Sequence, residues 1–154
     1  MKKFYNIEGL IRSGFQLSRD YHTLDFTYAR FGDAAVQAMA KSRSIKQVRR
    51  LTINGKKLTP LSARALAESD KLPNLESLKL YKNKIGDEGI KYLAESDKLP
   101  NLKSLRLAWN EIGPEGTRHL AESPYMGSLT SLSLSENRIG DEGLKYLAQA
   151  KSLS

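Results

Sequence analysis

The chain contains no cysteine and only two histidines, His22 and His119, which lie far apart in its 154 residues. The absence of cysteine excludes disulfide bonds, thiolate metal ligands and cysteine nucleophiles, and it fits a reducing compartment. Two distant histidines make a histidine-rich metal site implausible. We therefore expect neither a metal nor another cofactor.

Long apolar runs are also missing. No segment approaches the ~20 apolar residues needed to cross a bilayer, and the first residues hold no apolar run long enough for a signal peptide. We expect a cytoplasmic protein with no membrane partner. Signal-free secretion, as an effector, would leave no readable mark and stays open as an alternative.

What the chain does contain is a repeat of 27 residues. A fixed period of this length is typical of a solenoid, whose units bury their apolar faces only by stacking. A solenoid presents an extended surface and seldom a deep pocket, so binding is the expected kind of function. The five repeats, of which the first is degenerate, span residues 21–47, 48–74, 75–101, 102–128 and 129–154.

Each repeat begins with the pattern of a short strand. Numbered from the first residue of a repeat, positions 1, 4 and 6 are apolar, as in Leu75, Leu78 and Leu80, and the alternation of positions 4 and 6 indicates one buried face. Position 9 is Asn in the last three repeats. A buried Asn at a strand end can satisfy turn backbone groups of neighbouring coils, so we expect a ladder of Asn83, Asn110 and Asn137.

A helix is predicted in the second half of each repeat. Thr59 before Pro60 is a favourable start, and the acidic pairs at positions 13 and 14 suit the positive end of a helix dipole. Positions 16, 19 and 20 form an apolar stripe with i, i+3, i+4 spacing, as in Ile90, Leu93 and Ala94. Position 20 is Ala in all five repeats, which indicates close approach of helix and sheet.

The ends of the chain differ from each other. Residues 1–20 carry Ile7, Leu10 and Ile11 in the spacing of the helical stripe, and we interpret them as a capping half-repeat, with an independent targeting or partner-binding helix as the alternative. No polar cap follows the last repeat. The strand predicted over 130–136 is therefore a poorly protected edge, which suggests self-association or a longer parent chain.

The unit closely resembles the leucine-rich repeat, LxxLxLxxNxL, and the segment IGDEGxxxLA resembles the bacterial-type, ribonuclease-inhibitor-like subclass. The resemblance covers residues 21–154 and weakens in the first two repeats, where Ala29 and Lys56 replace the ladder Asn. It implies an α/β fold: a curved solenoid with parallel strands on the concave face, helices on the convex face, and proteins as the usual partners.

Candidate binding residues lie at positions 3, 5, 7 and 8, which should point out of the concave face. The net charge of +8 favours an acidic partner, and the centre of this face is basic and aromatic. Arg, Tyr and Trp are the usual anchors of interfaces. The predicted binding residues are Arg50, Lys79, Tyr81, Lys82, Arg106 and Trp109. Against this stands the plainer interpretation that Trp109 packs over its turn and the cations only solvate the surface.

Catalysis is not expected. The paired carboxylates of the DEG turns are better explained by helix ends, His119 takes the place of Tyr92 and Tyr146, and NGKK over 54–57 lacks the rest of a P-loop. We therefore predict a non-enzymatic protein-interaction module for an acidic or mixed protein surface. The alternatives are single-stranded nucleic-acid binding through the same face, and a regulatory or self-assembling scaffold segment.

Overall fold

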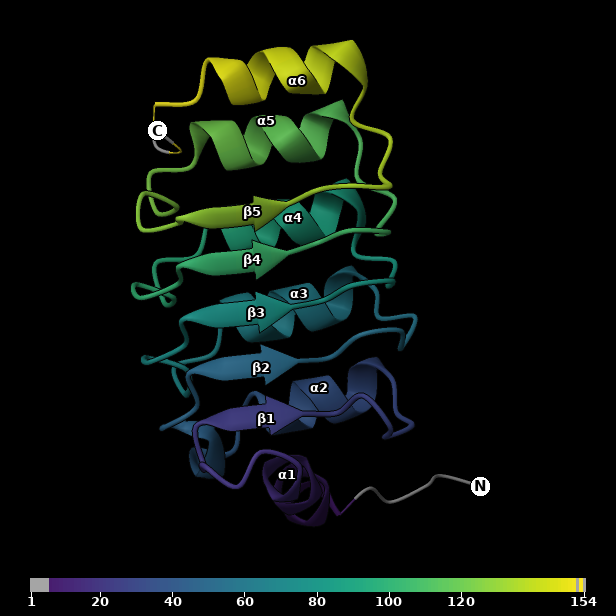
Figure 1. The fold of residues 1–154 in the computed structure, drawn as a ribbon, viewed down its shortest axis with the longest axis vertical. Helices are drawn as coiled ribbons and strands as arrows, with labels where there is room; N and C mark the ends of the chain where they lie inside the picture. Colours follow the sequence, from purple (N-terminus) through teal and green to yellow (C-terminus); the bar gives the residue numbers. More distant parts are fainter. Residues whose placement is uncertain (1–5, 152, 154) are drawn as a thin grey trace.

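The computed structural model describes residues 6–151 and 153. In this part of the chain, parallel strands alternate with helices in a stack of coils (Figure 1). The strands are β1 (Thr23–Asp25), β2 (Arg50–Thr52), β3 (Ser77–Lys79), β4 (Ser104–Arg106) and β5 (Ser131–Ser133). The helices are α1 (Ile7–Gln16), α2 (Asp33–Met39), the 3-10 turn η1 (Arg43–Ile45), α3 (Pro60–Ala67), α4 (Gly86–Ala94), α5 (Pro114–Glu122) and α6 (Gly140–Ala148).

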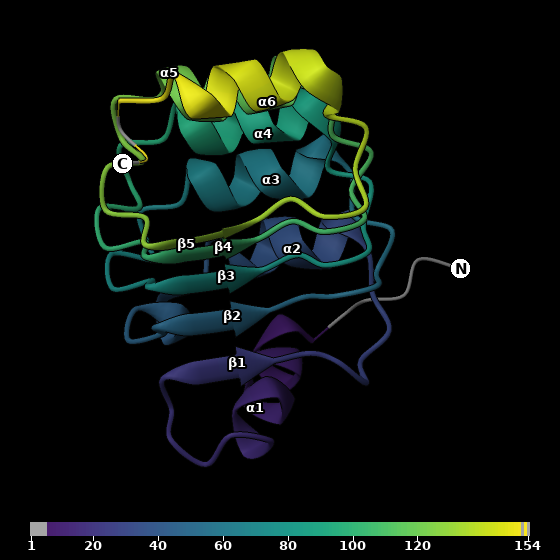
Figure 2. The same cartoon turned by 45° about the horizontal axis from the view of Figure 1, so that its top comes forward.

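The molecule has two layers, a sheet of order β1-β2-β3-β4-β5 and a row of helices behind it (Figures 1 and 2). Neighbouring strands pair in parallel at an offset of one repeat, so that Leu51 faces Leu78 and Leu78 faces Leu105. A helix needs about 10 Å of width and a strand only about 4.8 Å. The stack therefore bends toward its strands, which confirms the predicted leucine-rich-repeat solenoid.

One continuous apolar core fills the space between the layers. Leu78, Leu80, Leu105 and Leu107 at positions 4 and 6 are fully buried, as the alternation predicted. In the last coil the equivalent leucines are only half-buried and Leu144 of α6 is 55% exposed, because no further described coil covers them. Burial at a given position of the repeat thus depends on having a neighbour on both sides.

The predicted asparagine ladder is confirmed. Asn83 accepts the backbone N–H groups of Lys56 and Leu58 through Oδ1, at 2.9 and 3.0 Å, and donates through Nδ2 to the carbonyls of Ile53 and Leu80. Asn110 and Asn137 repeat this pattern one and two coils later. Each buried amide therefore ties its own turn to the preceding one, and leaves few turn groups without a partner.

The turn of the second coil is joined to the preceding turn without an asparagine. Lys56, which stands where the ladder Asn would be, extends its ammonium group to the carbonyl of Thr27 in the first coil at 2.9 Å and lies 5.9 Å from the ring centroid of Phe31. Burial lowers the pKa of Lys56, partly offset by the charge of Asp25. A lysine side chain therefore joins these two turns, in the place where later coils use an asparagine.

Helix starts are bonded across coils as well as within them. Thr59 caps α3 as predicted, with its hydroxyl accepting the N–H of Leu61. The structure adds that Asp33 of α2 accepts the N–H and the hydroxyl of Thr59 at 3.0 and 2.7 Å, and the hydroxyl of Ser62. Likewise Asp87 of α4 accepts the N–H of Gly113 at 2.6 Å, just before α5. An aspartate at position 13 therefore serves the next helix, beyond any dipole effect on its own.

Helix ends are braced by a second ladder that was not predicted. Ser69, Ser96 and Ser123 at position 22 each donate a hydrogen bond to a carbonyl at the end of the preceding helix, of Ala40, Ala67 and Ala94 respectively. The distances lie between 2.5 and 2.6 Å, and all three serines are buried. These bonds satisfy carbonyls that a helix end leaves open.

Helix α1 lies against β1 and α2 at the start of the stack (Figure 1). Ile11 is buried, Ile7 and Leu10 are half-buried, and Glu8 accepts hydrogen bonds from Ser42 and Ser44 at 2.6 Å. The division of the chain into a half-repeat over 1–20 and five repeats over 21–154 stays a prediction. Residues 1–5, 152 and 154 lie outside the described part of the chain.

Candidate functional site

The candidate site lies on the surface of the sheet that faces away from the helices, called here the strand face. It consists of positions 3, 5, 7 and 8 of each coil, whose side chains alternate with the buried leucines at positions 4 and 6. In β3, for example, Ser77 and Lys79 are half-buried while Leu78 between them is fully buried. The framework leucines thus fix where every side chain of the strand face emerges.

Position 8 has an unusual backbone. Lys82, Trp109 and Glu136 all have φ between 55° and 58°, in the left-handed region where Gly55 stands in the second coil. Side chains other than those of glycine occupy this region at a cost of about 1–2 kcal/mol each. Hydrogen bonds between coils hold the conformation, since Trp109 donates its N–H to the carbonyl of Ser135 and accepts from the N–H of Asn83.

Five of the six predicted binding residues are free to contact a partner. Trp109 is 50% and Tyr81 43% exposed, so both rings are accessible to a partner. Within the described part of the chain, the side chains of these five form no hydrogen bond or ion pair with another residue. They are Lys79, Tyr81, Lys82, Arg106 and Trp109.

Arg50 is the exception. Its guanidinium donates to Asp20 at 2.7 Å and to the hydroxyl of Thr23 at 2.9 Å. Burial raises the pKa of Asp20, but hydrogen bonds from the backbone of His22 and from Thr23 outweigh it and hold that pKa well below its usual range. The structure therefore places Arg50 in a bonded cluster at the β1 edge, apart from the free cations of β3 and β4.

A hollow of about 430 Å³ opens where the strands end and the turns begin. It brings together Lys82 and Trp109, whereas Arg50, Lys79, Tyr81 and Arg106 do not line it. The predicted binding residues include none of its other members. The register would have found them, because they are positions 8 to 10 of successive coils: Lys57, Asn83, Lys84, Glu111, Glu136, Asn137 and Arg138.

The chemistry of the hollow is that of a mixed but mainly basic recognition site. Lys57, Lys82, Lys84 and Arg138 outnumber Glu111 and Glu136, and the indole of Trp109 supplies the apolar surface. Such a set suits carboxylate-bearing and aromatic side chains of a partner. Among residues 6–151 and 153, no group of three or more His, Cys, Asp or Glu side chains could hold a metal ion, and no helix has the length and apolarity to cross a membrane.

Comparison with known proteins gives a family for the repeats. Residues 71–94, 98–121 and 128–148 match the model described as Leucine Rich repeat. No curated protein sequence matches the chain.

Solved structures share the fold at low sequence identity. The C-terminal domain of tropomodulin from Caenorhabditis elegans has a TM-score of 0.64 at 14% identity, over 94% of this chain and 90% of that one. Actin-binding site 2 of leiomodin-1 has a TM-score of 0.57 at 16% identity, over 77% of this chain and 73% of that one. An internalin, InlF, from Listeria monocytogenes gives a TM-score of 0.49 at 23% identity, over 73% of this chain, which spans only 28% of the internalin chain.

These likenesses concern the fold and leave the predicted ribonuclease-inhibitor-like subclass a prediction. The matched segments coincide with coils three to five, in which β3, β4 and β5 and the helices α4, α5 and α6 repeat at a constant offset. Three of the repeats match this model, and the five-stranded structure that the described chain builds has the leucine-rich-repeat fold.

Proposed function

We propose that the chain is a non-enzymatic protein-interaction module, which binds an acidic or mixed protein surface through its strand face. One observation carries the proposal: Lys79, Tyr81, Lys82, Arg106 and Trp109 lie on neighbouring coils, and none of these side chains is engaged by another described residue. Exposed tryptophan, tyrosine and arginine are the residues that most often dominate binding energy.

The backbone strain at Trp109 also supports this site. The residue adopts φ 58°, at a cost that a glycine would avoid, and its indole projects beside a hollow lined by cations. Strained positions of this kind cluster at functional sites. At the level of the fold, leiomodin-1 offers a precedent, since the structure that resembles this chain is an actin-binding site of that protein.

The binding surface is centred on coils three and four. Arg50 contributes less, because its guanidinium already donates to Asp20 and Thr23 and the carboxylate of Asp20 offsets its charge. The anchors are Trp109 and Tyr81, with Lys79, Lys82 and Arg106 as donors to carboxylates of the partner.

A pull-down from the lysate of the source cell, with and without nuclease, tests the proposal. The wild type is compared with the double variant Lys79→Glu with Trp109→Ala. The matched control, Lys145→Glu with Tyr125→Ala, also reverses one charge and removes one exposed aromatic ring, but in α6 and in a loop. We expect a discrete protein that survives nuclease, is lost with the strand-face variant and is kept by the control. Heterogeneous nucleic acid that disappears with nuclease, and a steep loss of binding with salt, would replace the proposal by nucleic-acid binding.

A further inference from the structure

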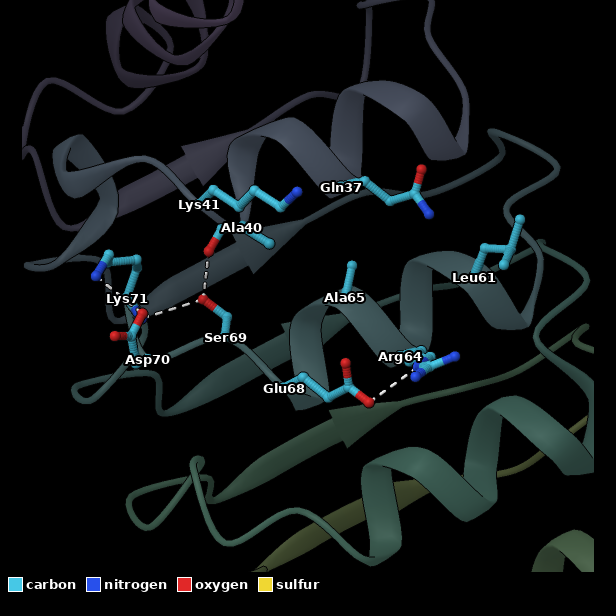
Figure 3. Close-up of a pocket in the computed structure, with 10 residues that line it drawn as sticks. All are labelled: Gln37, Ala40, Lys41, Leu61, Arg64, Ala65, Glu68, Ser69, Asp70 and Lys71. Carbon is cyan, nitrogen blue, oxygen red and sulfur yellow. Dashed lines mark hydrogen bonds and ion pairs between the residues drawn. The ribbon is translucent and has the colours of Figure 1, made fainter.

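A groove of about 650 Å³ runs between α2 and α3 on the helix side of the molecule, away from the strand face (Figure 3). Gln37, Ala40 and Lys41 lie on its α2 side, opposite Leu61 and Ala65 of α3. The hydrogen bond from Ser69 to the carbonyl of Ala40, at 2.6 Å, closes it at one end.

The residue at position 18 of the repeat distinguishes the second coil from the later ones. In coils three to five this position is Tyr92, His119 and Tyr146, and each of these rings is half-buried. The ring of Tyr92 packs back toward the preceding helix, where the guanidinium of Arg64 lies 5.5 Å from its centroid. In the second coil the same position is Ala65, so the space that a ring occupies elsewhere is left open.

The polar partners of that ring have changed as well. Tyr146 donates its hydroxyl to Glu142 at 3.1 Å, and Tyr92 is paired with Glu88 in the same way. The second coil has Leu61 in place of this glutamate, and Leu61 is 53% exposed. The cation at position 17 of the preceding helix, Arg64 in the Tyr92 contact, is replaced by Gln37. The groove therefore has room for an aromatic ring. Since Leu61 replaces the glutamate that accepts a tyrosine hydroxyl, a ring without a hydroxyl group fits it better.

The rim of the groove has one unused charge. Arg64 is paired with Glu68 and Lys71 with Asp70, each at 2.9 Å. Among the described residues, the ammonium group of Lys41 has no hydrogen-bond or ion-pair partner, and its side chain lies along the opening (Figure 3). The groove therefore combines an open apolar floor with a free cation at its edge.

We propose that this groove is a second binding site, which takes one apolar aromatic side chain of a partner protein together with a neighbouring carboxylate. The ring would occupy the place that Tyr92 and Tyr146 occupy in their own coils, over Leu61 and Ala65. The carboxylate would pair with Lys41. This site is independent of the strand face, because the two lie on opposite layers of the solenoid.

The probe is 3-phenylpropionate, which joins a phenyl ring to a carboxylate, with 3-phenylpropylamine as its cationic counterpart. We expect saturable NMR shifts of the Ala40 and Ala65 methyl groups on titration with 3-phenylpropionate. Ala65→Tyr, which restores the ring of the other coils, should abolish the shift of the remaining reporter, the Ala40 methyl group, without lowering the melting temperature. Lys79→Glu with Trp109→Ala should leave them unchanged, so that failure of this proposal is distinguishable from failure of the first.

Lys41→Glu tests the charge separately. It should weaken binding of 3-phenylpropionate about fivefold and make 3-phenylpropylamine the better ligand, since one exposed ion pair is worth on the order of this factor. Lys91→Glu, a charge change of the same size on α4, should alter neither. The absence of saturable shifts, shifts that persist in Ala65→Tyr, or equal binding of the two probes by the wild type would each overturn the proposal.

Discussion

The side-chain oxygen of Asn137 accepts the backbone N–H of Asn110 at 2.8 Å, while the amide group of Asn110 donates to the carbonyl of Leu80 one coil earlier. Asn110 therefore supports the preceding coil and is itself supported by the asparagine of the next coil. This arrangement couples the coils through buried hydrogen bonds as well as through the apolar core, and it makes the ladder a sensitive place for mutation.

Asn110→Ala should lower the free energy of unfolding by about 2–4 kcal/mol, because it leaves buried backbone groups of two coils without a partner. Its side chain is fully buried and bonds the N–H of Ile85 and the carbonyls of Leu80 and Leu107. Asn101→Ala is the matched control, since Asn101 is exposed and its side chain bonds only the carbonyl of Pro73, at 2.8 Å. Chemical denaturation measures both, and equal effects would contradict a special role of the ladder.

Gly116→Ala should destabilise the protein by about 1–3 kcal/mol through overpacking. A Cβ at this position would lie 2.5 Å from Oδ1 of Asp87 and 2.7 Å from Cγ2 of Ile112. It would therefore disturb the bond by which Asp87 caps α5. Gly127→Ala, where a Cβ would meet no atom within 4 Å, should change the melting temperature little. A neutral Gly116→Ala would show that adjacent helices can separate without loss.

The replacement of Trp109 by Gly should give a more stable protein than its replacement by Ala, by about 1 kcal/mol, because only glycine is unstrained at φ 58°. Both variants lose the indole, so the difference between their unfolding free energies reports the backbone conformation at this position. Tyr81, whose φ is not in the left-handed region, is the control. There the Ala variant should be at least as stable as the Gly variant, and the same order at both sites would argue against strain at Trp109.

Asp33→Asn should make the protein less stable at neutral pH and remove part of its acid sensitivity. Burial raises the pKa of Asp33, but hydrogen bonds from Ser62 and from the N–H and hydroxyl of Thr59 outweigh it, so the pKa lies below its usual 3.8. A carboxyl group with a lowered pKa stabilises the fold above its unfolded-state pKa and loses this contribution as the pH falls through the folded-state pKa.

The difference in unfolding free energy between wild type and Asp33→Asn should accordingly be constant from pH 7 to about 5 and shrink below about 4. Asp141 occupies the same position in the fifth coil, where no described helix follows for it to cap. Asp141→Asn should therefore give a small and flat difference over the same range. Denaturation curves recorded at each pH decide, and parallel behaviour of the two variants would refute the capping role.

The repeat itself could be predicted to a large extent. Leu78, Leu105 and the ladder asparagines lie where the 27-residue period placed them, since each coil has the same neighbours and local spacing decides which side chains face the core. The candidate site was harder to predict. The repeat pattern assigns its side chains to the strand face, but no periodic signal distinguishes a cation that is free, such as Lys82, from one that is already paired, such as Arg50.

The sequence by itself determined the solenoid, the strand and helix of each coil, and the set of side chains that emerge from the strands. These follow from apolar spacing within one repeat. Only the tertiary structure decided what meets across coils: the Asp33 cap on the next helix, the bond of Arg50 to Asp20, and the open space over Ala65. The physical reason is that these contacts join residues about one repeat apart, and their geometry depends on how closely successive coils stack.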